Sequence, residues 1–506
     1  MNRSKSEITE RSITGADFLQ LSIANAPAGG RSAWLADRLR SAISDGRLPI
    51  GSRLPASRVL AAELRVSRGV VTEAYQRLVE DGHVVGRGRG GTIVVAAPVT
   101  SPASAEPGSP STEPTAAPTT DPTAGPNAGP FAGPPGLDVF DALREAPARV
   151  DLTPGVPDLA AFPRAAWLRA ERTVLGSLSA SDLGYGDPRG TSSLRQAVAN
   201  WLARNRGIRA DPGEVVIVAG VSQALGLLAQ VLGLPAIAVE DPGSLGTRQH
   251  LRNWGVATPP VSVDSHGLRV SALTAPAVLV TPAHQFPTGV VLSGERRREL
   301  LDWASSGGVI IEDDYDAEHR YDRPPVPALR SMVSTRVCYA GSVSKLLAPA
   351  LRIGWLLVPP RHHADVVAAK RNADLGNGVL AQFVLAHLME SGALEQQLRY
   401  LRPRHRRRRD AMIAAIRASL PGASVHGAAA GLHLTVTFPG SFSDVALAGA
   451  VLERGVKVQP LSWHRQRDGA PGLVLGYAAR TSSEIADAVS AIGSVLGDFG
   501  QPRSRR

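Results

Sequence analysis

Cysteine is almost absent from this sequence, since Cys338 is the only one among 506 residues. A single cysteine excludes an internal disulfide and a zinc site built from cysteines. Long apolar stretches are missing too: no run of 18 apolar residues occurs, and the first ten residues lack the apolar core of a signal peptide. We therefore expect a cytoplasmic protein without a membrane-spanning segment.

Lysine is scarce although the chain is basic. Only four of its 55 lysines and arginines are lysines, and the formal net charge is +10. Residues 1–97 hold 14 basic residues against nine acidic ones, which is half of the excess and suggests a polyanionic partner. The 12 histidines show no spacing typical of metal ligands, so we predict no metal site.

Residues 98–136 differ in composition from the rest of the chain. Eleven of these 39 residues are prolines, and most others are Ala, Thr, Gly or Ser. Such a segment cannot bury enough apolar surface to offset the entropy lost on ordering. Because 506 residues exceed one ordinary domain, we predict a domain over 15–97, a semi-extended linker over 98–136 and a second domain over 138–506.

The N-terminal region predicts three short helices followed by a β-hairpin. Apolar residues recur at helical spacing in three stretches, namely Leu35, Leu39 and Ile43; Val59, Leu60 and Leu64; and Val70, Val71, Ala74, Tyr75, Leu78 and Val79. Two short strands then flank a tip rich in glycine and arginine. This order predicts an α+β winged helix-turn-helix whose third helix enters the DNA major groove. A small helical domain with an ordinary basic face is the alternative.

The candidates for DNA contact are polar residues on the second helix, the third helix and the wing. Ser67, Arg68 and Thr72 begin the third helix, nearest base edges and phosphates. Arg58 is placed for a phosphate, and the wing arginines Arg87 and Arg89 for a phosphate or the minor groove. The string from Gly51 to Tyr75 closely resembles the GntR-type winged-helix domain.

Residues 138–506 alternate helical stretches with short apolar strands. The strands are expected over 215–218, 236–239, 277–280, 309–312, 337–340 and 353–358. This alternation indicates an α/β domain with a mostly parallel sheet, in which ligands bind beyond the strand ends.

Lys345 follows one of these strands and is the strongest candidate for chemistry. Attack on an aldehyde requires a lysine of lowered pKa, and Arg352 could help to lower it while it binds a phosphate. The hydroxyls of Ser342 and Ser344 stand just before Lys345, where a phosphate could also be bonded. We interpret Lys345 as the lysine that forms a Schiff base with pyridoxal 5′-phosphate (PLP), rather than a surface lysine at a strand end. The segment resembles the PLP-lysine motif of fold-type I aminotransferases.

A second strand ends in acidic residues that suit the ring of PLP. An aspartate there would keep the pyridine nitrogen protonated, and a tyrosine would bond the ring O3′. The resemblance assigns Asp313 to the nitrogen, with Asp314 as its rival, and Tyr315 to O3′. Phe286 occupies the position of an asparagine that aminotransferases usually place against O3′.

Two further segments resemble the phosphate site of the same family. Ser222 and Gln223 open a helix after a strand, where helix amides favour an anion, and the resemblance assigns both to the phosphate. Tyr185 matches the tyrosine that reaches the phosphate of the neighbouring subunit, which implies a homodimer.

Together these segments resemble the MocR/GabR group of GntR regulators, whose effector domain is a fold-type I aminotransferase-like PLP domain with a small C-terminal α+β domain. Two departures weaken the enzyme interpretation. Ser244 stands where the family usually has an aromatic residue that stacks on the ring, and Val474 where aminotransferases have an arginine for the substrate carboxylate.

We therefore predict a PLP-dependent transcriptional regulator that binds a DNA operator as a homodimer. Its effector would be an amine, an amino acid or PLP itself. The alternatives are an active aminotransferase with an accessory DNA-binding domain, and a regulator whose PLP fold no longer holds cofactor.

The most basic run of the chain extends from Arg399 to Arg409. It could be a second DNA contact. We favour a solvated helix face that leads into the small C-terminal domain.

Overall fold

The computed structural model describes residues 26–27, 30–44, 47–81, 83–86, 91–95, 129–321 and 326–499. The chain divides into two compact units between Thr123 and Ala124, and each unit has its own hydrophobic core. Among the described residues, no helix combines the length and apolar character needed to span a membrane.

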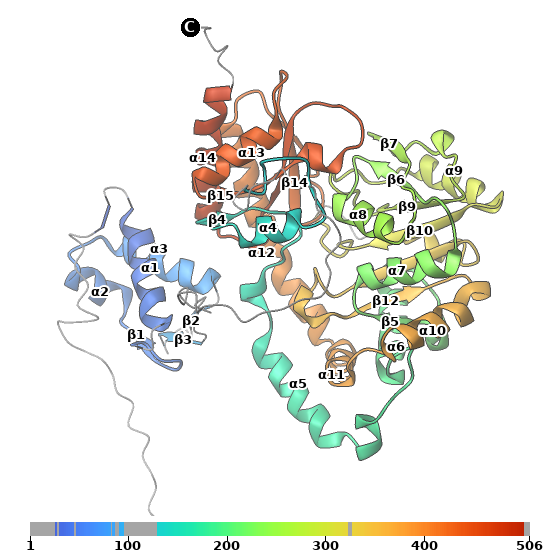
Figure 1. The fold of residues 1–506 in the computed structure, drawn as a ribbon. Coiled ribbons are helices and arrows are strands. Elements are labelled where there is room, and N and C mark those ends of the chain that lie inside the picture. The colour runs from blue at the N-terminus through green and yellow to red at the C-terminus, as the bar shows by residue number, and fades with distance from the viewer. Residues whose placement is uncertain are drawn as a thin grey trace, which may run out of the picture. The chain divides into compact units, whose positions relative to one another are not determined.

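The N-terminal unit consists of three helices and a small antiparallel sheet, labelled in Figure 1. Its elements are α1 (Arg31–Ser44), β1 (Arg53–Leu54), α2 (Ser57–Glu63), α3 (Arg68–Glu80), β2 (Val84–Gly86) and β3 (Thr92–Val94), with strand order β1-β3-β2. The predicted three helices and hairpin are confirmed, and β1 adds a third strand. The wing tip with Arg87 and Arg89 lies outside the described residues.

The core of this unit forms where the three helices meet. Its fully buried side chains include Leu35, Leu39, Leu60, Val71, Ala74 and Leu78. Val59, predicted for the buried face of the second helix, is instead 44% exposed, because its neighbours Leu60 and Ala61 are the residues that α2 turns to the core. The Tyr75 hydroxyl donates to the Pro55 carbonyl at 2.8 Å and so ties α3 to the loop before α2.

An eight-stranded sheet forms the centre of the C-terminal unit, with strand order β5-β12-β11-β10-β9-β6-β7-β8. The strands are β5 (Val216–Val218), β6 (Ala238–Asp241), β7 (Pro260–Asp264), β8 (Gly267–Leu268), β9 (Ala277–Val280), β10 (Val309–Asp314), β11 (Val337–Ser342) and β12 (Gly354–Leu357). All six predicted strands are present, and β7 and β8 extend one edge. Neighbouring strands in the series β11, β10, β9, β6 and β7 pair in parallel. Strand β12 lies between β11 and β5 and is antiparallel to both.

Helices cover both faces of this sheet. They are α5 (Arg164–Ser177), α6 (Ser192–Arg206), α7 (Val221–Leu232), α8 (Leu245–Asn253), α9 (Gly294–Ser305), α10 (Pro360–Asp374) and α11 (Val379–Glu390). Ile217 packs with α6 and α11, while its strand neighbours Val216 and Val218 pack with α7 and α10. The two faces alternate along the strand, as the two-residue period of a strand requires.

A smaller α+β domain completes the unit. Its elements are α4 (Val139–Glu145), β4 (Val150–Asp151), α12 (Ala393–Ser419), β13 (Ser424–His426), β14 (His433–Thr437), α13 (Asp444–Glu453), β15 (Val456–Lys457), β16 (Gln459–Pro460), β17 (Gly472–Gly476) and α14 (Ser482–Phe499). Strands β13, β14, β17 and β16 form an antiparallel sheet in that order. Because β4 pairs with β15, the beginning of the unit packs against its end.

A buried ion-pair cluster fixes the segment that follows β4. Asp158 is 3% exposed, and its Oδ2 lies 3.0 Å from Nη2 of Arg404 and 2.7 Å from Nη1 of Arg408, both on α12. Two guanidinium groups therefore share one buried carboxylate. This anchor holds the stretch around Gly155, which reaches the functional site described below.

We predict that Asp158→Ala lowers the unfolding free energy of the C-terminal unit by about 3–5 kcal/mol, because it removes the buried carboxylate that the two arginines share. Urea denaturation monitored by tryptophan fluorescence measures this change. Asp410→Ala is the matched control, since Asp410 pairs with Arg409 but is 55% exposed, and should cost less than about 1 kcal/mol. Equal losses in the two variants would contradict the assignment.

Candidate functional site

The predicted cofactor residues lie at one edge of the central sheet. The parallel strands β6, β9, β10 and β11 end at this edge, and the segments after them carry Ser244, Phe286, Tyr315 and Lys345, respectively. Strand β12 runs the opposite way and begins at the same edge, next to Arg352. Motifs far apart in the sequence thus meet at the carboxyl ends of the strands.

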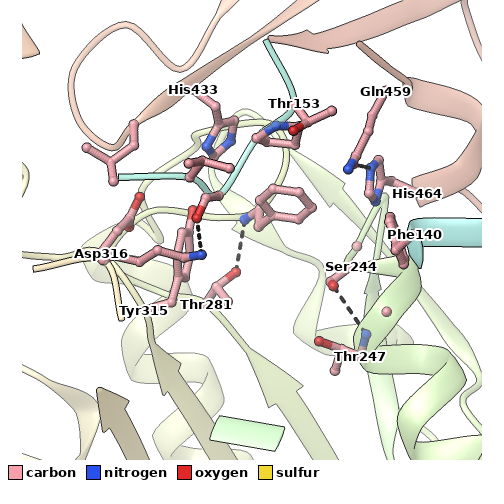
Figure 2. A pocket seen from close by; sticks show the side chains of 18 of the residues that line it. Phe140, Thr153, Ser244, Thr247, Thr281, Tyr315, Asp316, His433, Gln459 and His464 are labelled. Atoms are coloured by element: carbon pink, nitrogen blue, oxygen red, sulfur yellow. Dashed lines mark hydrogen bonds between the residues drawn. The ribbon is translucent and has the colours of Figure 1, made fainter. Parts of the chain in front are cut away.

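A cavity of about 590 Å³ opens at this edge, between the sheet and the small domain. Its lining includes Gly155, Ser244, Asp313, Tyr315, Asp316 and Lys345 from the large domain and His433, Lys457, Gln459 and His464 from the small one. Figure 2 shows Tyr315 and His433 toward one side of the cavity, and Ser244 and His464 toward the other. The cavity is large enough for a cofactor and a small ligand.

Lys345 donates a hydrogen bond from Nζ to the carbonyl of Gly155. A Cβ at residue 155 would stand 3.0 Å from this Nζ, and the φ of Gly155 is +87°, so only glycine fits here easily. Burial lowers the pKa of Lys345, while Asp316 and Asp313 act against the shift. The shift comes from burial and not from Arg352, whose guanidinium donates to the carbonyl of Ala219 instead.

Asp313 and Asp314 make different contacts. Oδ2 of Asp314 accepts hydrogen bonds of 2.5 Å from Nε of Arg206 and from the Tyr339 hydroxyl. Asp313 lines the cavity, and its buried Oδ1 has no partner among the described residues. Burial is the largest cause that raises the pKa of Asp313 to about 7. A protonated pyridine nitrogen would supply the missing donor, so the cavity fits the ring of PLP at Asp313 rather than at Asp314.

Tyr315 presents a hydroxyl to the same cavity. Burial, the largest cause, raises its pKa well above the ordinary value, so the hydroxyl keeps its proton at neutral pH. This oxygen lies 2.9 Å from Nδ1 of His284, which in turn lies 2.9 Å from Oδ2 of Asp316. No role for His284 is predicted from the sequence, although it stands two residues before Phe286.

A candidate phosphate site surrounds the N-terminus of α7. A Cβ at Gly220 would stand 3.2 Å from two nitrogens of Arg352, so the missing side chain makes room for that guanidinium. Ser222 is exposed in the first turn of α7. Ser342 is buried, and its Oγ accepts from the backbone N–H of Ser344 at 3.4 Å. A guanidinium, helix amides and hydroxyls together suit a phosphate.

The side chains of the other two residues assigned to the phosphate, Gln223 and Tyr185, do not take part in this candidate site. Oε1 of Gln223 accepts from the backbone N–H of Ala219 at 2.7 Å and from Lys370 at 3.0 Å, and its Nε2 donates to Asp374 at 2.7 Å. The Gln223 side chain is therefore engaged elsewhere. Tyr185 is 97% exposed, so within one chain it has no place in the site.

The two departures noted in the sequence have structural consequences. The Ser244 hydroxyl accepts from the backbone N–H of Thr247 at 3.2 Å, so it caps α8 and presents no ring to the cavity. Val474 is fully buried on β17, opposite Gln459 of β16. The cavity has a different cation nearby, because Lys457 lines it and donates to the carbonyl of Arg144 at 2.9 Å.

The candidate DNA-contacting residues form a separate surface on the N-terminal unit. Arg58, Ser67, Arg68 and Thr72 are all exposed. Nε of Arg68 lies 3.4 Å from Oγ of Ser57, so the start of α3 adjoins the start of α2. The Ser67 side chain makes no capping bond and remains available.

The basic run of the sequence lies on α12. Arg404 and Arg408 turn inward to Asp158, whereas four arginines of the run are exposed, namely Arg399, Arg402, Arg406 and Arg407. The exposed members agree with the interpretation as a solvated helix face.

The comparisons with known proteins match both units. The family model for bacterial regulatory proteins of the gntR family matches residues 32–94, and the model for class I and II aminotransferases matches residues 149–492. The solved multiple substrate aminotransferase from Thermococcus profundus is 27% identical, with a TM-score of 0.65, and covers 70% of this chain and 93% of its own.

Relatives with both units align along most of the chain. The probable rhizopine catabolism regulatory protein MocR of Rhizobium meliloti is 30% identical over 474 residues, which cover 91% of this chain and 93% of the relative. The pyridoxine biosynthesis regulator PdxR of Corynebacterium glutamicum is 31% identical over 471 residues, 90% and 95% of the two chains. The regulator TauR of Rhodobacter capsulatus is 32% identical over 489 residues, 93% and 98%. The aminotransferase domain and its structural neighbours imply that PLP is the cofactor.

We predict that Lys345→Ala abolishes the visible absorbance of bound PLP while circular dichroism shows a folded protein. Borohydride reduction of the loaded wild-type protein, followed by peptide mass spectrometry, should place the cofactor on Lys345. Lys457→Ala is the matched control, because Lys457 lines the same cavity, and should keep the absorbance. A reduced adduct on Lys457, or one that survives in Lys345→Ala, would show that the lysine is misassigned.

Proposed function

Because this chain belongs to the MocR/GabR type of GntR transcriptional regulators, we propose that it couples ligand binding at its PLP site to operator binding by a homodimer. One observation carries the proposal. A single chain has an exposed winged-helix surface and, in a separate unit, a cavity where Lys345, Asp313 and Tyr315 suit PLP.

The residues around the cavity would hold PLP in the following way. Lys345 would bond to its aldehyde carbon, Asp313 would accept from the pyridine nitrogen, and Tyr315 would donate to O3′. The phosphate would lie between Arg352, Ser222, Ser342, Ser344 and the backbone amides at the start of α7. Gln223 would contribute its main-chain N–H and not its side chain, which is engaged elsewhere. PLP supplies an aldehyde that captures amines and a ring that withdraws electrons.

The exposure of Tyr185 supports the homodimer. A tyrosine that is 97% exposed has surface to offer a second subunit. We propose that each Tyr185 reaches the phosphate held by the partner chain. This would explain why it has no contact with the site of its own chain.

The effector would be a molecule that carries a primary amine, or PLP itself. An amine can replace Lys345 at the aldehyde carbon, and this exchange frees the lysine. The effector changes DNA affinity only if it binds one state of the dimer better than the other. We therefore expect the part of the cavity beyond the ring to differ in shape between the two states.

The start of the C-terminal unit offers a route from the cavity to the linker. Phe131, in the segment assigned to the linker, stacks on Trp463 with ring centroids 5.2 Å apart. The next residue, His464, lines the cavity, and its carbonyl accepts from the backbone N–H of Gly243 at 2.7 Å. A ligand that displaces His464 would thus disturb the anchor of the linker that leads to the DNA-binding unit.

An active aminotransferase is the second candidate function. The intact set of Lys345, Asp313 and Tyr315 favours it, whereas Val474 and Ser244 oppose it. Val474 cannot hold a substrate carboxylate, and Ser244 cannot stack on the ring, so the substrate would lack two customary constraints on its orientation.

We predict weak or absent transamination of common α-amino acids. A steady-state assay with PLP, a panel of amino donors and common keto acids measures it. Slow half-reactions remain compatible with a regulator. Turnover of several per second, near ordinary enzyme values, would place the protein among the enzymes and make its DNA-binding unit accessory.

We predict that Arg68→Ala weakens operator binding by about 1–3 kcal/mol, as expected for loss of a base-edge contact. Fluorescence anisotropy with duplexes selected by the full-length protein measures this affinity. Arg77→Ala is the matched control on the same helix, since Arg77 pairs with Glu73 at 2.8 Å near the other end of α3. Losses of the same size in both variants would contradict the assignment of Arg68 to a base-edge contact.

A further inference from the structure

A buried hydrogen-bonded trio adjoins the wall of the cavity. Nδ1 of His284 lies 2.9 Å from Oδ2 and 3.2 Å from Oδ1 of Asp316, and 2.9 Å from the hydroxyl oxygen of Tyr315. His284 and Asp316 are each 1% exposed. Figure 2 shows Asp316 and Tyr315 next to each other on this wall. The assigned cofactor contacts include Tyr315 but leave the other two residues without a role.

The hydrogen bonds determine which nitrogen of His284 carries the proton. A carboxylate can only accept, so the contact with Asp316 requires a proton on Nδ1. Nε2 is buried and has no partner among the described residues. A proton on Nε2 would therefore be an unsatisfied buried donor, which is costly. The neutral tautomer with the proton on Nδ1 satisfies the site best.

Close packing prevents the ring from leaving this position. A Cβ at Gly431 would stand 2.0 Å from Cε1 of His284, and one at Gly289 would stand 3.0 Å from its Nε2. Both glycines have positive φ, +82° and +71°. The backbone of two different loops thus holds the imidazole where Nδ1 meets Asp316 and Tyr315.

We propose that His284, fixed by Asp316, is a positioning residue for the cofactor that turns the hydroxyl proton of Tyr315 toward O3′ of PLP. Nδ1–H donates to Asp316, which is the other acceptor near the tyrosine, and lies against the Tyr315 oxygen, so the imidazole offers that oxygen a donor and no acceptor. The hydroxyl proton of Tyr315 is thereby directed into the cavity. This support acts where Phe286 replaces an asparagine that would itself contact O3′. The inference rests on the proposed PLP site.

The charged and titratable groups around the trio are compatible with this role. Asp313 and Lys345 line the same cavity. The ring of His433 lies 5.2 Å from that of His284, and burial lowers the pKa of His433 to about 3, so it adds no charge at neutral pH. Burial raises the pKa of Glu240 to about 7. In the described part of the chain, none of these four side chains replaces His284 as a hydrogen-bond partner of Tyr315.

The experiment is a pH titration of the visible absorbance of the full-length protein loaded with PLP. Negative charge on O3′ favours a proton on the nitrogen that joins Lys345 to PLP. A hydrogen-bond donor to O3′ reduces this charge and so lowers the pH at which that nitrogen loses its proton. His284→Ala should therefore shift the spectral midpoint to higher pH, by about one unit. His433→Ala, which removes a neighbouring buried imidazole that bonds to the Pro287 carbonyl instead, should leave the midpoint near that of the wild type.

Tyr315→Phe completes a double-mutant cycle. If His284 acts through the tyrosine, adding His284→Ala to Tyr315→Phe should cause no further shift. Equal midpoints in wild type and His284→Ala, or additive shifts in the double variant, would overturn the inference while the PLP site stands. A wild-type protein without visible absorbance would overturn the proposed function itself.

A metal at this place is the competing arrangement. Ligand atoms of His284, Asp316 and His433 lie within 4.8 Å of one another. Metal analysis of the purified protein should find less than one equivalent of zinc. One equivalent that His284→Ala releases would overturn the inference, because Nδ1 or Nε2 would then be a ligand.

Discussion

The burial of charged groups at the carboxyl edge of the central sheet is the constraint on which the site depends. Asp313 has a buried oxygen without a hydrogen-bond donor among the described residues, and Lys345 loses hydration on burial. Both conditions are costly in an isolated chain. In the proposed site, a bound ring with a protonated nitrogen would donate to the aspartate, and its aldehyde would take up the lysine, so both costs would fall.

The fold class of both units follows from the sequence, whereas the role of Lys345 stays a prediction. Apolar strands in alternation with helices indicated the sheet, and the residues after the strands indicated the site. The resemblance assigns Asp313 to the pyridine nitrogen but keeps Asp314 as its rival, because the choice depends on which face of β10 each side chain takes. Asp314 is held by Arg206, 108 residues away in sequence, and no local pattern reveals that contact.

Two other outcomes depended on contacts distant in sequence. The amide of Gln223 is captured by Asp374 and Lys370, which lie 151 and 147 residues further along the chain. His284 is held by Asp316 across 32 residues and by Gly289 and Gly431, which belong to two different loops. Propensity and spacing report on neighbours, so they point to Lys345 within its motif but not to the surrounding residues that orient the site.

The proposed regulator needs a connection between its enzyme-like cavity and its linker. Phe131 stacks on Trp463, and the next residue, His464, lines the cavity. An aminotransferase needs a rigid hold on its substrate. A regulator needs a ligand-dependent difference between two states. It can therefore do without the arginine that binds the substrate carboxylate in aminotransferases, whose position Val474 takes in this chain.

The most direct test measures operator affinity of the full-length protein loaded with PLP, with and without a panel of amines and amino acids. The account predicts that at least one amine changes the affinity of the wild type by about tenfold or more, equivalent to about 1.4 kcal/mol of coupling. It also predicts that the same amine has no effect on Lys345→Ala. The proposed function would be contradicted if the operator affinity of the wild type stayed the same with every compound of the panel and also after removal of PLP.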